Sequence, residues 1–308
     1  MNKNKLEDRG KCPLCGSLQS AIYIAFPEIP VLQCSQCSFL YSGWVLSAAE
    51  LFSYYQDNYG SMRHLQGQVV NAAINAWVTA LLVDMTGVKR VLDIGTGYGF
   101  LLDALTKRYK VEAAGVELSQ QEAEYAVKKL GLNVINLPID QSGLQIASYD
   151  LVTVFEVIEH ILDPISFIRE ITQYVKPGGY VLILTDNFRS RMAQSLGPGF
   201  PKWIPHTHIS HFSPLTLQKA IEAGGLSVVR SKSYTPWEIM ARDAYYRIRR
   251  IRKTPAEAFN LELTLKSEMS GGYRLFALRR LINRLWVGST LTSKMDGDMM
   301  YFLARRDE

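Results

Sequence analysis

The chain has 308 residues, of which 47% are hydrophobic and 20% are charged. This length exceeds that of one average domain, and the apolar content is enough to build a real core, so an intrinsically disordered chain is excluded. The formal net charge of +5 favours anionic partners, but a charge of this size does not by itself indicate a nucleic-acid-binding protein.

The sequence carries no signal for secretion or for a membrane span. The first residues, Met1 to Asp8, lack the apolar stretch of a signal peptide, and no run of 18 uncharged apolar residues occurs. We therefore expect a cytoplasmic protein.

All four cysteines lie within the first 37 residues and form two C-x-x-C pairs separated by eighteen residues. Each pair projects two thiolates from one tight turn, and two such turns give the tetrahedral S₄ shell that Zn²⁺ prefers. Disulfides are the alternative, but a chain without a secretion signal resides where thiols stay reduced. Residues 1–44 are therefore predicted to form a zinc ribbon, with a structural Zn²⁺ bound by Cys12, Cys15, Cys34 and Cys37.

This ribbon is a weak candidate for binding nucleic acid. The basic side chains of residues 1–40 all precede the first cysteine pair, and two acids lie beside them. Such a distribution gives a poor phosphate-binding surface. We expect the ribbon instead to pack on the rest of the chain and to help wall a substrate pocket.

Residues 45–85 are predicted to form a helical cap, because apolar side chains recur there at helical spacing, as in Val69, Val70, Ala73, Ile74, Trp77, Ala80 and Leu81. The same region contains three tyrosines between Tyr54 and Tyr59. These tyrosines either bring a phenol near a substrate or serve only in packing.

The segment from Val91 to Leu102 has the pattern of a buried strand, a glycine turn and the start of a helix. Gly95, Gly97 and Gly99 let the backbone turn tightly and approach a ligand closely. The run differs from the dinucleotide fingerprint G-x-G-x-x-G, because its glycines alternate and Asp93 precedes them. A carboxylate repels a pyrophosphate but suits a cationic ammonium or sulfonium, and S-adenosylmethionine carries both.

A second carboxylate, Glu117, ends the next predicted strand, which starts at Val111. Its distance along the chain from the glycine turn is about that of the acid that binds ribose hydroxyls in a doubly wound fold. We therefore expect Glu117 to hold the ribose of the cofactor.

Two further strands complete the pattern. The strand Tyr149–Phe155 leads into Glu-Val-Ile-Glu-His at residues 156–160, and Lys-Pro-Gly-Gly at residues 176–179 turns into the strand Tyr180–Leu184. Each feature alone is weak, since a glycine turn is often only a turn. In this order, however, they resemble the class I methyltransferases over roughly residues 86–234. The Glu-x-x-Glu-His segment is most similar to the branch that holds the ubiquinone-pathway O-methyltransferases and many sugar methyltransferases.

This resemblance implies both a fold and a cofactor. The expected fold class is α/β, with a Rossmann-like seven-stranded methyltransferase sheet, a small N-terminal zinc ribbon and a helical insertion before the last strand. Similar cysteine modules precede the catalytic domain of sugar C-methyltransferases. The implied cofactor is S-adenosylmethionine, and the residues implied to bind it are Asp93, Gly95, Thr96, Gly97, Gly99, Glu117, Leu118, Phe155 and Glu156.

Four of the five histidines follow predicted strands: His160 after the fourth, and His206, His208 and His211 after the fifth. Ligands bind at the carboxyl ends of parallel strands, so both groups are expected to face one crevice. Methyl transfer needs a base wherever the nucleophile carries a proton, and histidine is the usual base near neutral pH. The candidate catalytic residues are therefore His208, His160 and His211.

The segment Thr207–Pro214 resembles a Glu-His-Leu-Ser-Tyr-Phe-Ser stretch of the sugar C-methyltransferases, whose histidine is a proposed general base. His208 matches that histidine, but Thr207 replaces the glutamate and His211 replaces the tyrosine. These departures leave open whether carbon or oxygen is methylated. Ser213-Pro214 is also a good helix start, so capping is an alternative explanation for part of the motif.

Glu156, Glu159 and His160 raise the alternative of a catalytic divalent cation. Related ubiquinone-pathway enzymes use Glu and His of this segment to hold such a cation, and their spacing brings the groups together on a helix. The alternative is that these side chains cap a helix.

Residues 226–234 and 298–304 are predicted to be the sixth and seventh strands, and the insertion at 235–296 separates them before the last segment, 297–308. Helical stretches are expected at 237–253 and 273–287, with arginines at positions 242, 247, 249, 250, 252, 274, 279, 280 and 284 and a lysine at 253. The second stretch has an apolar face made by Leu275, Leu278, Leu281, Ile282, Leu285 and Trp286.

Three interpretations of this insertion compete: a lid that buries its leucines on the core, a surface that binds anionic lipid, and a pocket wall that grips substrate phosphates. Arginine predominates over lysine, which suits bidentate contacts with phosphate. We therefore favour a phosphorylated glycan intermediate as the substrate and consider peripheral contact with an anionic membrane.

The leading hypothesis is a methyltransferase that acts on a small-molecule acceptor, a sugar or glycan-pathway intermediate, through oxygen or carbon. An rRNA or tRNA methyltransferase is the first alternative, but the Asn-Pro-Pro-Tyr-like sequence used by amino-group methylases is replaced by Phe155-Glu156-Val157. A non-catalytic scaffold is the second alternative, and the intact Asp93, glycines and Glu117 argue against it. The oligomeric state is not encoded by any motif.

Overall fold

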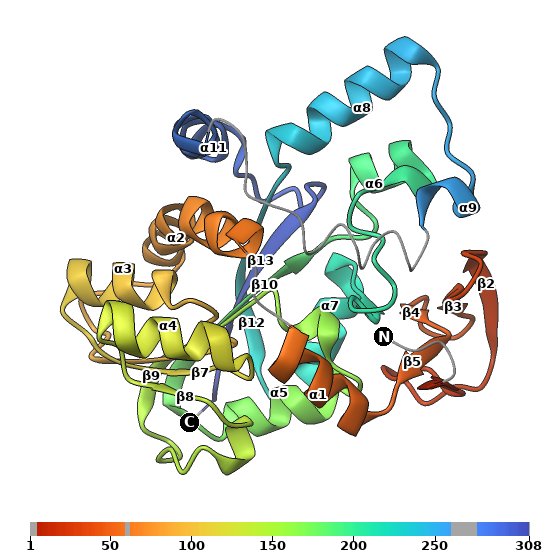
Figure 1. Ribbon diagram of the computed structural model, residues 1–308. Helices are drawn as coiled ribbons and strands as arrows, with labels where there is room; N and C mark the ends of the chain where they lie inside the picture. Colours follow the sequence, from red (N-terminus) through yellow and green to blue (C-terminus); the bar gives the residue numbers. More distant parts are fainter. Residues whose placement is uncertain (1–4, 59–61, 260–275, 308) are drawn as a thin grey trace.

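A seven-stranded sheet forms the centre of the molecule (Figure 1), and the computed structural model describes residues 5–58, 62–259 and 276–307 of the chain. The strand order is β12-β13-β10-β9-β6-β7-β8. The strands are β6 (Arg90–Ile94), β7 (Glu112–Val116), β8 (Val134–Ile135), β9 (Tyr149–Phe155), β10 (Val175–Asp186), β12 (Ser227–Tyr234) and β13 (Met299–Arg305).

From β8 to β10 the strands run parallel, and β13 is antiparallel to both of its neighbours. The parallel strands have near-continuous apolar sequences because helices cover both faces of the sheet. Val91, Leu92 and Leu151 are all fully buried, for example. This sheet confirms the predicted fold class. One detail differs: the Lys-Pro-Gly-Gly segment lies inside β10, with a register shift between Val175 and Tyr180.

Helices form a layer on each face of the sheet. One apolar core lies beneath α2 and α3, and the other lies beneath α5 and α7. Figure 1 shows α2, α3 and α4 together on one side of the sheet. The helices of these layers are α1 (Ala48–Asn58), α2 (Met62–Leu82), α3 (Phe100–Tyr109), α4 (Gln120–Leu130), α5 (Pro164–Thr172) and α7 (Pro214–Ala223).

The cysteine module shares a sheet with the core. Its strands β2 (Ser20–Ile24), β3 (Val31–Cys34) and β4 (Leu40–Ser42) are continued by β11 (Ser210–His211), which comes from the segment after β10. Ser210 pairs with Tyr41, and His211 pairs with Leu40. A second pairing joins β1 (Leu6–Asp8) to β5 (Trp44–Leu46). The module is thus docked on the core by backbone hydrogen bonds, as expected from the sequence.

Short helices connect these parts. Three 3₁₀ turns, η2 (Ile139–Gln141), η3 (Ile158–His160) and η4 (Gly197–Gly199), and the short helix α6 (Arg191–Leu196) lie in the loops of the sheet. The insertion between β12 and β13 contains α8 (Trp237–Arg249), α9 (Pro255–Ala258) and α11 (Phe276–Thr290).

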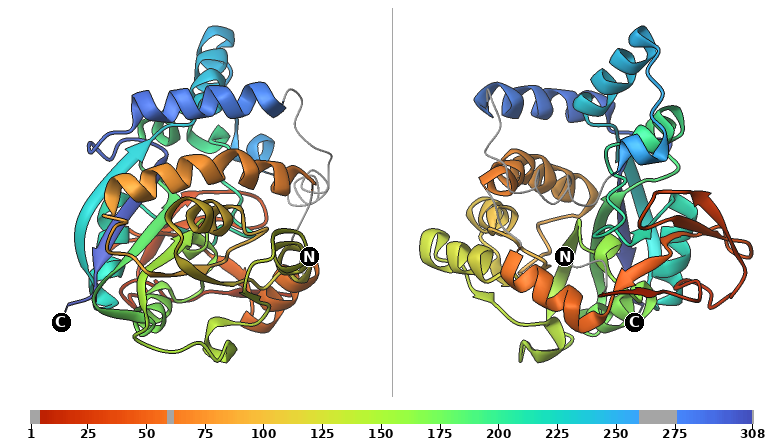
Figure 2. Two further views of the ribbon diagram at one scale, coloured as in Figure 1. Left: turned by 90° about the vertical axis from the view of Figure 1, so that its left-hand side faces the viewer. Right: turned by 45° about the vertical axis from the view of Figure 1, so that its right-hand side comes forward.

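Figure 2 shows α8 and α11 at the same end of the molecule. The first helix is shorter than predicted: it ends at Arg249, because Arg250 has a left-handed φ of 52°. Arg274 and Leu275 lie outside the described residues, as do the side chains of Arg279 and Arg280. None of the helices that the structure describes has the length and apolar character needed to cross a bilayer.

Candidate active site

The loop between β6 and α3 contains three glycines with left-handed backbone conformations, with φ of 70° at Gly95, 58° at Gly97 and 83° at Gly99. At Gly97 a Cβ would also lie only 2.3 Å from the side-chain nitrogen of Gln68. Only glycine fits this position without strain or displacement of a neighbour. At the predicted glycine turn, the backbone of the loop therefore packs closely against α2.

Asp93 holds this loop from the end of β6. Its buried carboxylate accepts hydrogen bonds from the hydroxyl of Thr96 at 2.8 Å and from that of Thr153 at 2.6 Å. Burial raises the pKa of Asp93 to about 6, although both hydroxyl donors oppose the shift. Asp93 and Thr96 thus fix the shape of the glycine loop.

Glu117 directly follows β7 and faces the same loop. Its two carboxylate oxygens accept the backbone N–H groups of Gly97 at 2.8 Å and of Ser119 at 2.7 Å. Burial and the nearby Glu122 raise its pKa to about 7, against the effect of these donors. Each oxygen retains a lone pair, so the carboxylate can still accept hydrogen bonds from ligand hydroxyls. The adjacent Leu118 is half-buried, and Asn136 fixes its carbonyl at 2.9 Å.

Helix α2 closes the loop with a polar contact that the sequence did not reveal. The Gln68 side chain accepts the backbone N–H of Tyr98 at 2.9 Å and donates to Glu122 at 3.2 Å. Burial disfavours the charged form of His64. The carboxylate of Glu122, 2.6 Å from the His64 ring, outweighs this effect and raises the pKa of His64. No motif marks these residues, because the contact depends on how α2 packs against α4.

A second cluster of polar side chains lies at the ends of β9 and β10. The rings of His160 and His208 meet edge to face with 4.8 Å between their centroids. His208 Nδ1 lies 3.2 Å from the carboxylate of Asp186, the last residue of β10. The structure therefore brings together two of the three candidate catalytic histidines.

The partners of both rings define which nitrogen carries the proton. His160 Nδ1 lies 2.9 Å from the carbonyl oxygen of Thr207 and 2.8 Å from the hydroxyl of Tyr55. A carbonyl only accepts, so this Nδ1 is the donor and Nε2 is the basic nitrogen. The carboxylate of Asp186, 3.2 Å from Nδ1 of His208, favours the proton on that nitrogen and leaves Nε2 as the basic nitrogen. Burial and then His208 lower the pKa of His160 well below its usual range, which favours a neutral ring.

Lys202 connects Asp186 to Glu156. Its Nζ lies 2.9 Å from Asp186 and 3.4 Å from Glu156. Burial disfavours its charge, but the two carboxylates outweigh this effect and raise the pKa of Lys202. Burial also acts against Asp186, yet Lys202 and His208 lower the pKa of Asp186 to about 2. Asp186 is therefore ionised at neutral pH.

Glu156 has a left-handed φ of 55°, which is uncommon for a side chain of this size and is typical of functional sites. Phe155, which precedes it, packs against Tyr301 with 5.9 Å between ring centroids. Among the residues implied to bind the cofactor, Phe155 therefore contributes packing, and Glu156 turns toward Lys202.

Glu159 lies completely buried beneath the two histidines. One of its oxygens accepts a hydrogen bond from Thr185 at 2.8 Å. Burial and the nearby Asp186 and Glu156 raise the pKa of Glu159 well above its ordinary value. The potential ligand atoms of Glu159, His160 and His208 lie within 4.8 Å of one another. This set differs from the predicted one, because His208 takes the place of Glu156.

His211 and His206 both pack against aromatic side chains. The ring of His211 is 4.6 Å from that of Phe188 and 5.0 Å from that of Trp203, and its Nε2 is 3.4 Å from the hydroxyl of Ser42. Burial lowers the pKa of His211 well below its usual range. His206 stacks on Phe259. Aromatic rings and Ser42 therefore surround His211, whereas His160 and His208 contact each other.

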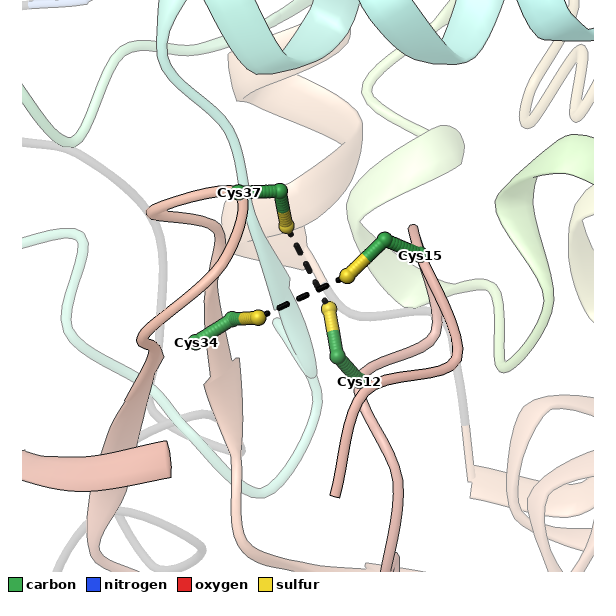
Figure 3. Close-up of side chains that lie close together, drawn as sticks. All are labelled: Cys12, Cys15, Cys34 and Cys37. Atoms are coloured by element: carbon green, nitrogen blue, oxygen red, sulfur yellow. Dashed lines mark hydrogen bonds between the residues drawn. The ribbon is translucent and has the colours of Figure 1, made fainter. Parts of the chain in front are cut away.

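The four cysteines converge as predicted (Figure 3). Their Sγ atoms all lie within 4.8 Å of one another, with 3.6 Å between Cys12 and Cys37 and 3.5 Å between Cys15 and Cys34. All four are free thiols. Zn–S bonds of about 2.3 Å in a tetrahedron require sulfur separations close to these values, so the donor set fits a tetrahedral metal.

Arg9 links the cysteine module to the histidine pair. Its guanidinium donates to the carbonyls of Leu162 and Ile209 and to the hydroxyl of Ser210. Leu162 lies just beyond His160, and Ile209 follows His208, so Arg9 ties together the two segments that carry these histidines. Burial lowers the pKa of Arg9 to about 10, so the side chain remains charged at neutral pH.

Sequence reasoning missed Asp186, Lys202 and Arg9. Asp186 had a usable signal, since it is an acid at the carboxyl end of a parallel strand, as Glu117 is. The strand was predicted to end two residues earlier, at Leu184. No sequence signal marks Lys202 or Arg9, because their partners lie far from them along the chain.

A family model described as a methyltransferase domain matches residues 66–231. The "Ubiquinone biosynthesis O-methyltransferase" of Neisseria meningitidis serogroup C is 28% identical over 166 residues, which cover 49% of this chain and 69% of that protein. The enzyme of the same name from Aeromonas salmonicida is 30% identical over 49% of this chain and 68% of its own length.

Solved structures show the same fold at low identity. A putative sarcosine dimethylglycine methyltransferase from Galdieria sulphuraria has a TM-score of 0.50 at 15% identity, with 76% of this chain and 86% of that one covered. The [4+2]-cyclase SpnF also has a TM-score of 0.50 at 15% identity, over 82% of this chain and 86% of its own. These two likenesses concern the fold alone.

Replacing Arg9 tests the link between the cysteine module and the core. Arg9→Met keeps the length of the side chain but removes the guanidinium donor of the Leu162 carbonyl and one of the two donors of the Ile209 carbonyl. Loss of a donor from a part-buried carbonyl costs roughly 1–3 kcal/mol. We expect the melting temperature to fall by several degrees in calorimetry. Lys11→Met removes an exposed positive charge from the same segment and is the matched control. Equal melting temperatures for the two variants would show that Arg9 contributes nothing.

Proposed function

Because the chain belongs to the methyltransferase domain family and is an S-adenosylmethionine-dependent methyltransferase, we propose that it methylates a small-molecule acceptor with His208 as general base. The observation that carries this proposal is the buried contact between His208 and Asp186 at the carboxyl edge of the sheet. This contact leaves Nε2 of His208 as a basic nitrogen, and we place it in the same site as the glycine loop and Glu117.

S-adenosylmethionine supplies an electrophilic methyl group on a sulfonium when it is bound. The residues of this chain fit the cofactor: Glu117 can accept hydrogen bonds from ribose hydroxyls, and the glycine loop allows close backbone approach. His208 Nε2 would take the proton of the acceptor, and the ionised Asp186 would stabilise the imidazolium that forms. Gln68 of α2 holds the loop by accepting the backbone N–H of Tyr98.

The acceptor is proposed to be a sugar or glycan-pathway intermediate, methylated at oxygen or carbon. The side chains near His208 are mostly polar or charged, including Tyr55, Lys202 and Glu156, and such a lining suits an acceptor with several hydroxyls. A phenolic acceptor is the second class to test, because the similar proteins named above are O-methyltransferases of ubiquinone biosynthesis.

We also propose that the four cysteines bind one structural zinc ion. The convergence of four thiols supports this, and a closed shell of four thiolates leaves no position for catalysis. Metal analysis should find one zinc per chain, and Cys12→Ser should abolish it and lower thermal stability. Ser35→Ala, next to a cysteine, should keep the metal. Purified protein that is folded, reduced and free of zinc would contradict the assignment.

Glu117→Gln tests the cofactor site. Loss of charge-assisted hydrogen bonds should weaken the binding of S-adenosylhomocysteine about 10- to 100-fold in calorimetric titration. Glu112→Gln is the matched control, since Glu112 is an exposed glutamate in β7, the strand that Glu117 follows. It should change the affinity less than about twofold.

The pH dependence provides a second measure of Glu117. Ligand hydroxyls stabilise its ionised form, and its pKa in the free protein is raised to about 7. Binding should therefore release a proton, and the affinity should fall as the pH decreases below 7. Glu117→Gln should remove most of this dependence. A dependence that persists in Glu117→Gln would assign it to another group.

His208→Gln tests the proposed base. Removal of a general base should lower kcat about 10²- to 10⁴-fold while S-adenosylhomocysteine still binds. His206→Gln, a buried histidine of the same segment, should keep most of the activity. Nucleotide-linked sugars and phenols would be compared as acceptors. Activity on phenols alone would contradict the sugar proposal, and full activity of His208→Gln would contradict the assigned base.

A further inference from the structure

The leucines of α11 face outward. Leu278, Leu281 and Leu285 recur at spacings of three and four residues, so they lie along one side of the helix. Their exposed fractions are 51%, 57% and 68%. Val287 on the opposite side is buried in the core. The interpretation of α11 as a lid that buries these leucines is therefore wrong, because the helix docks through its other face.

Helix α8 repeats this arrangement. Tyr245 is 52% exposed and Ile248 is 80% exposed, and Ala241 continues the same side of the helix. The inner side is formed by the buried Ile239 and Asp243. The exposed apolar side chains of α8 and α11 thus lie on two helices at one end of the molecule (Figure 2). We call this pair of exposed faces the outer helical surface.

Positive charge accompanies these apolar side chains. Residues 237–253 contain six basic and two acidic side chains. One of the acids, Asp243, is paired with Arg247 at 2.8 Å. Arg242 and Arg249 are exposed on α8, and Arg284 is exposed on α11. Exposed leucine or isoleucine beside arginine is the pattern of helices that lie in a membrane interface.

Basic side chains also line a cavity on the inner side of α8. It has a volume of about 670 Å³ and lies between α6 and the end of α8. Its lining includes Ser195, Arg247, Arg250, Arg252 and Lys253. Asp243 is the acid in this lining, and its pairing with Arg247 leaves an excess of positive charge. A phosphate group matches this set of donors.

We propose that the outer helical surface docks on an anionic lipid bilayer. The exposed leucines and Ile248 enter the boundary between headgroups and acyl chains, and the exposed arginines beside them contact lipid phosphates. A second copy of the chain fits less well, because a twofold contact would place the same arginines against each other. None of the residues of the outer helical surface belongs to the proposed catalytic site, so docking does not depend on the reaction.

Vesicle sedimentation of the full chain tests this proposal. Protein is mixed with vesicles of phosphatidylcholine alone or with added phosphatidylglycerol. We expect at least about tenfold stronger binding to the anionic vesicles and a loss of this preference at high salt. The variant Arg242→Gln/Arg249→Gln should also lose the preference.

The apolar contribution is tested with matched triple variants. Ile248→Gln/Leu281→Gln/Leu285→Gln removes side chains of the outer helical surface that are 80%, 57% and 68% exposed. Leu18→Gln/Ile146→Gln/Leu215→Gln removes side chains elsewhere that are 79%, 62% and 59% exposed. All six positions tolerate a polar side chain, so both proteins should keep the wild-type melting temperature. The first variant should lose at least about tenfold in vesicle binding, and the second should retain it.

Three results would overturn the proposal. They are absence of binding to anionic vesicles, equal loss of binding in both triple variants, and self-association of the wild-type chain that the first triple variant abolishes in the absence of vesicle binding. The last result would assign the surface to a second copy of the chain.

Discussion

Buried carboxylates at one edge of the sheet constrain the rest of this structure. Asp93 lies at the end of β6, Glu117 directly follows β7, and Asp186 ends β10, all nearly inaccessible to solvent. Parallel strands bring their carboxyl ends to the same edge, so these charges are concentrated in one place. A buried carboxylate is costly without partners, and each partner must come from a different part of the chain. The need to satisfy these groups therefore determines which segments converge on the site.

The partners differ along the edge and divide it into two halves. Asp93 and Glu117 are satisfied by hydroxyls and backbone N–H groups of the glycine loop and its neighbours, and burial raises the pKa of both. Asp186 is paired with Lys202 and lies 3.2 Å from His208, and against the effect of burial these neighbours lower its pKa to about 2. The first half can therefore change protonation when a ligand with hydroxyl groups binds, while the second half keeps a fixed negative charge beside a histidine. That difference matches the separate demands of holding a cofactor and accepting a proton.

The fold, and the half of the sheet edge that contains Asp93 and Glu117, could be predicted because their sequence signals are local. A glycine turn, an acid after a strand and the apolar strands are each visible in a few consecutive residues, and they define the sheet, the loop and Glu117. The half of the edge that contains Asp186 and His208 could be predicted only in part. His160 and His208 were identified by their positions after strands, but the same reasoning included His211, which lies in an aromatic environment beside Ser42. The roles of Lys202 and Arg9 depend on contacts between distant segments, which no spacing rule encodes.

The leucines of α11 show a different limit of sequence analysis. Helical periodicity predicts which side chains share a face, but it does not predict whether that face contacts the core or the solvent.

The segment that carries His208 is held by parts of the chain that lie beyond the family match. The match covers residues 66–231, which include the glycine loop, Glu117 and both histidines, but neither the cysteine module nor the insertion. Arg9 of that module contacts backbone groups beside both histidines, and Ser42 donates to the carbonyl of Pro205 at 2.7 Å. The position of the segment that carries His208 is thus set by a module that the matched region lacks. Relatives that share only the matched region can share cofactor chemistry while their acceptor sites are shaped by different contacts, so the acceptor of this protein has to be derived from its own residues.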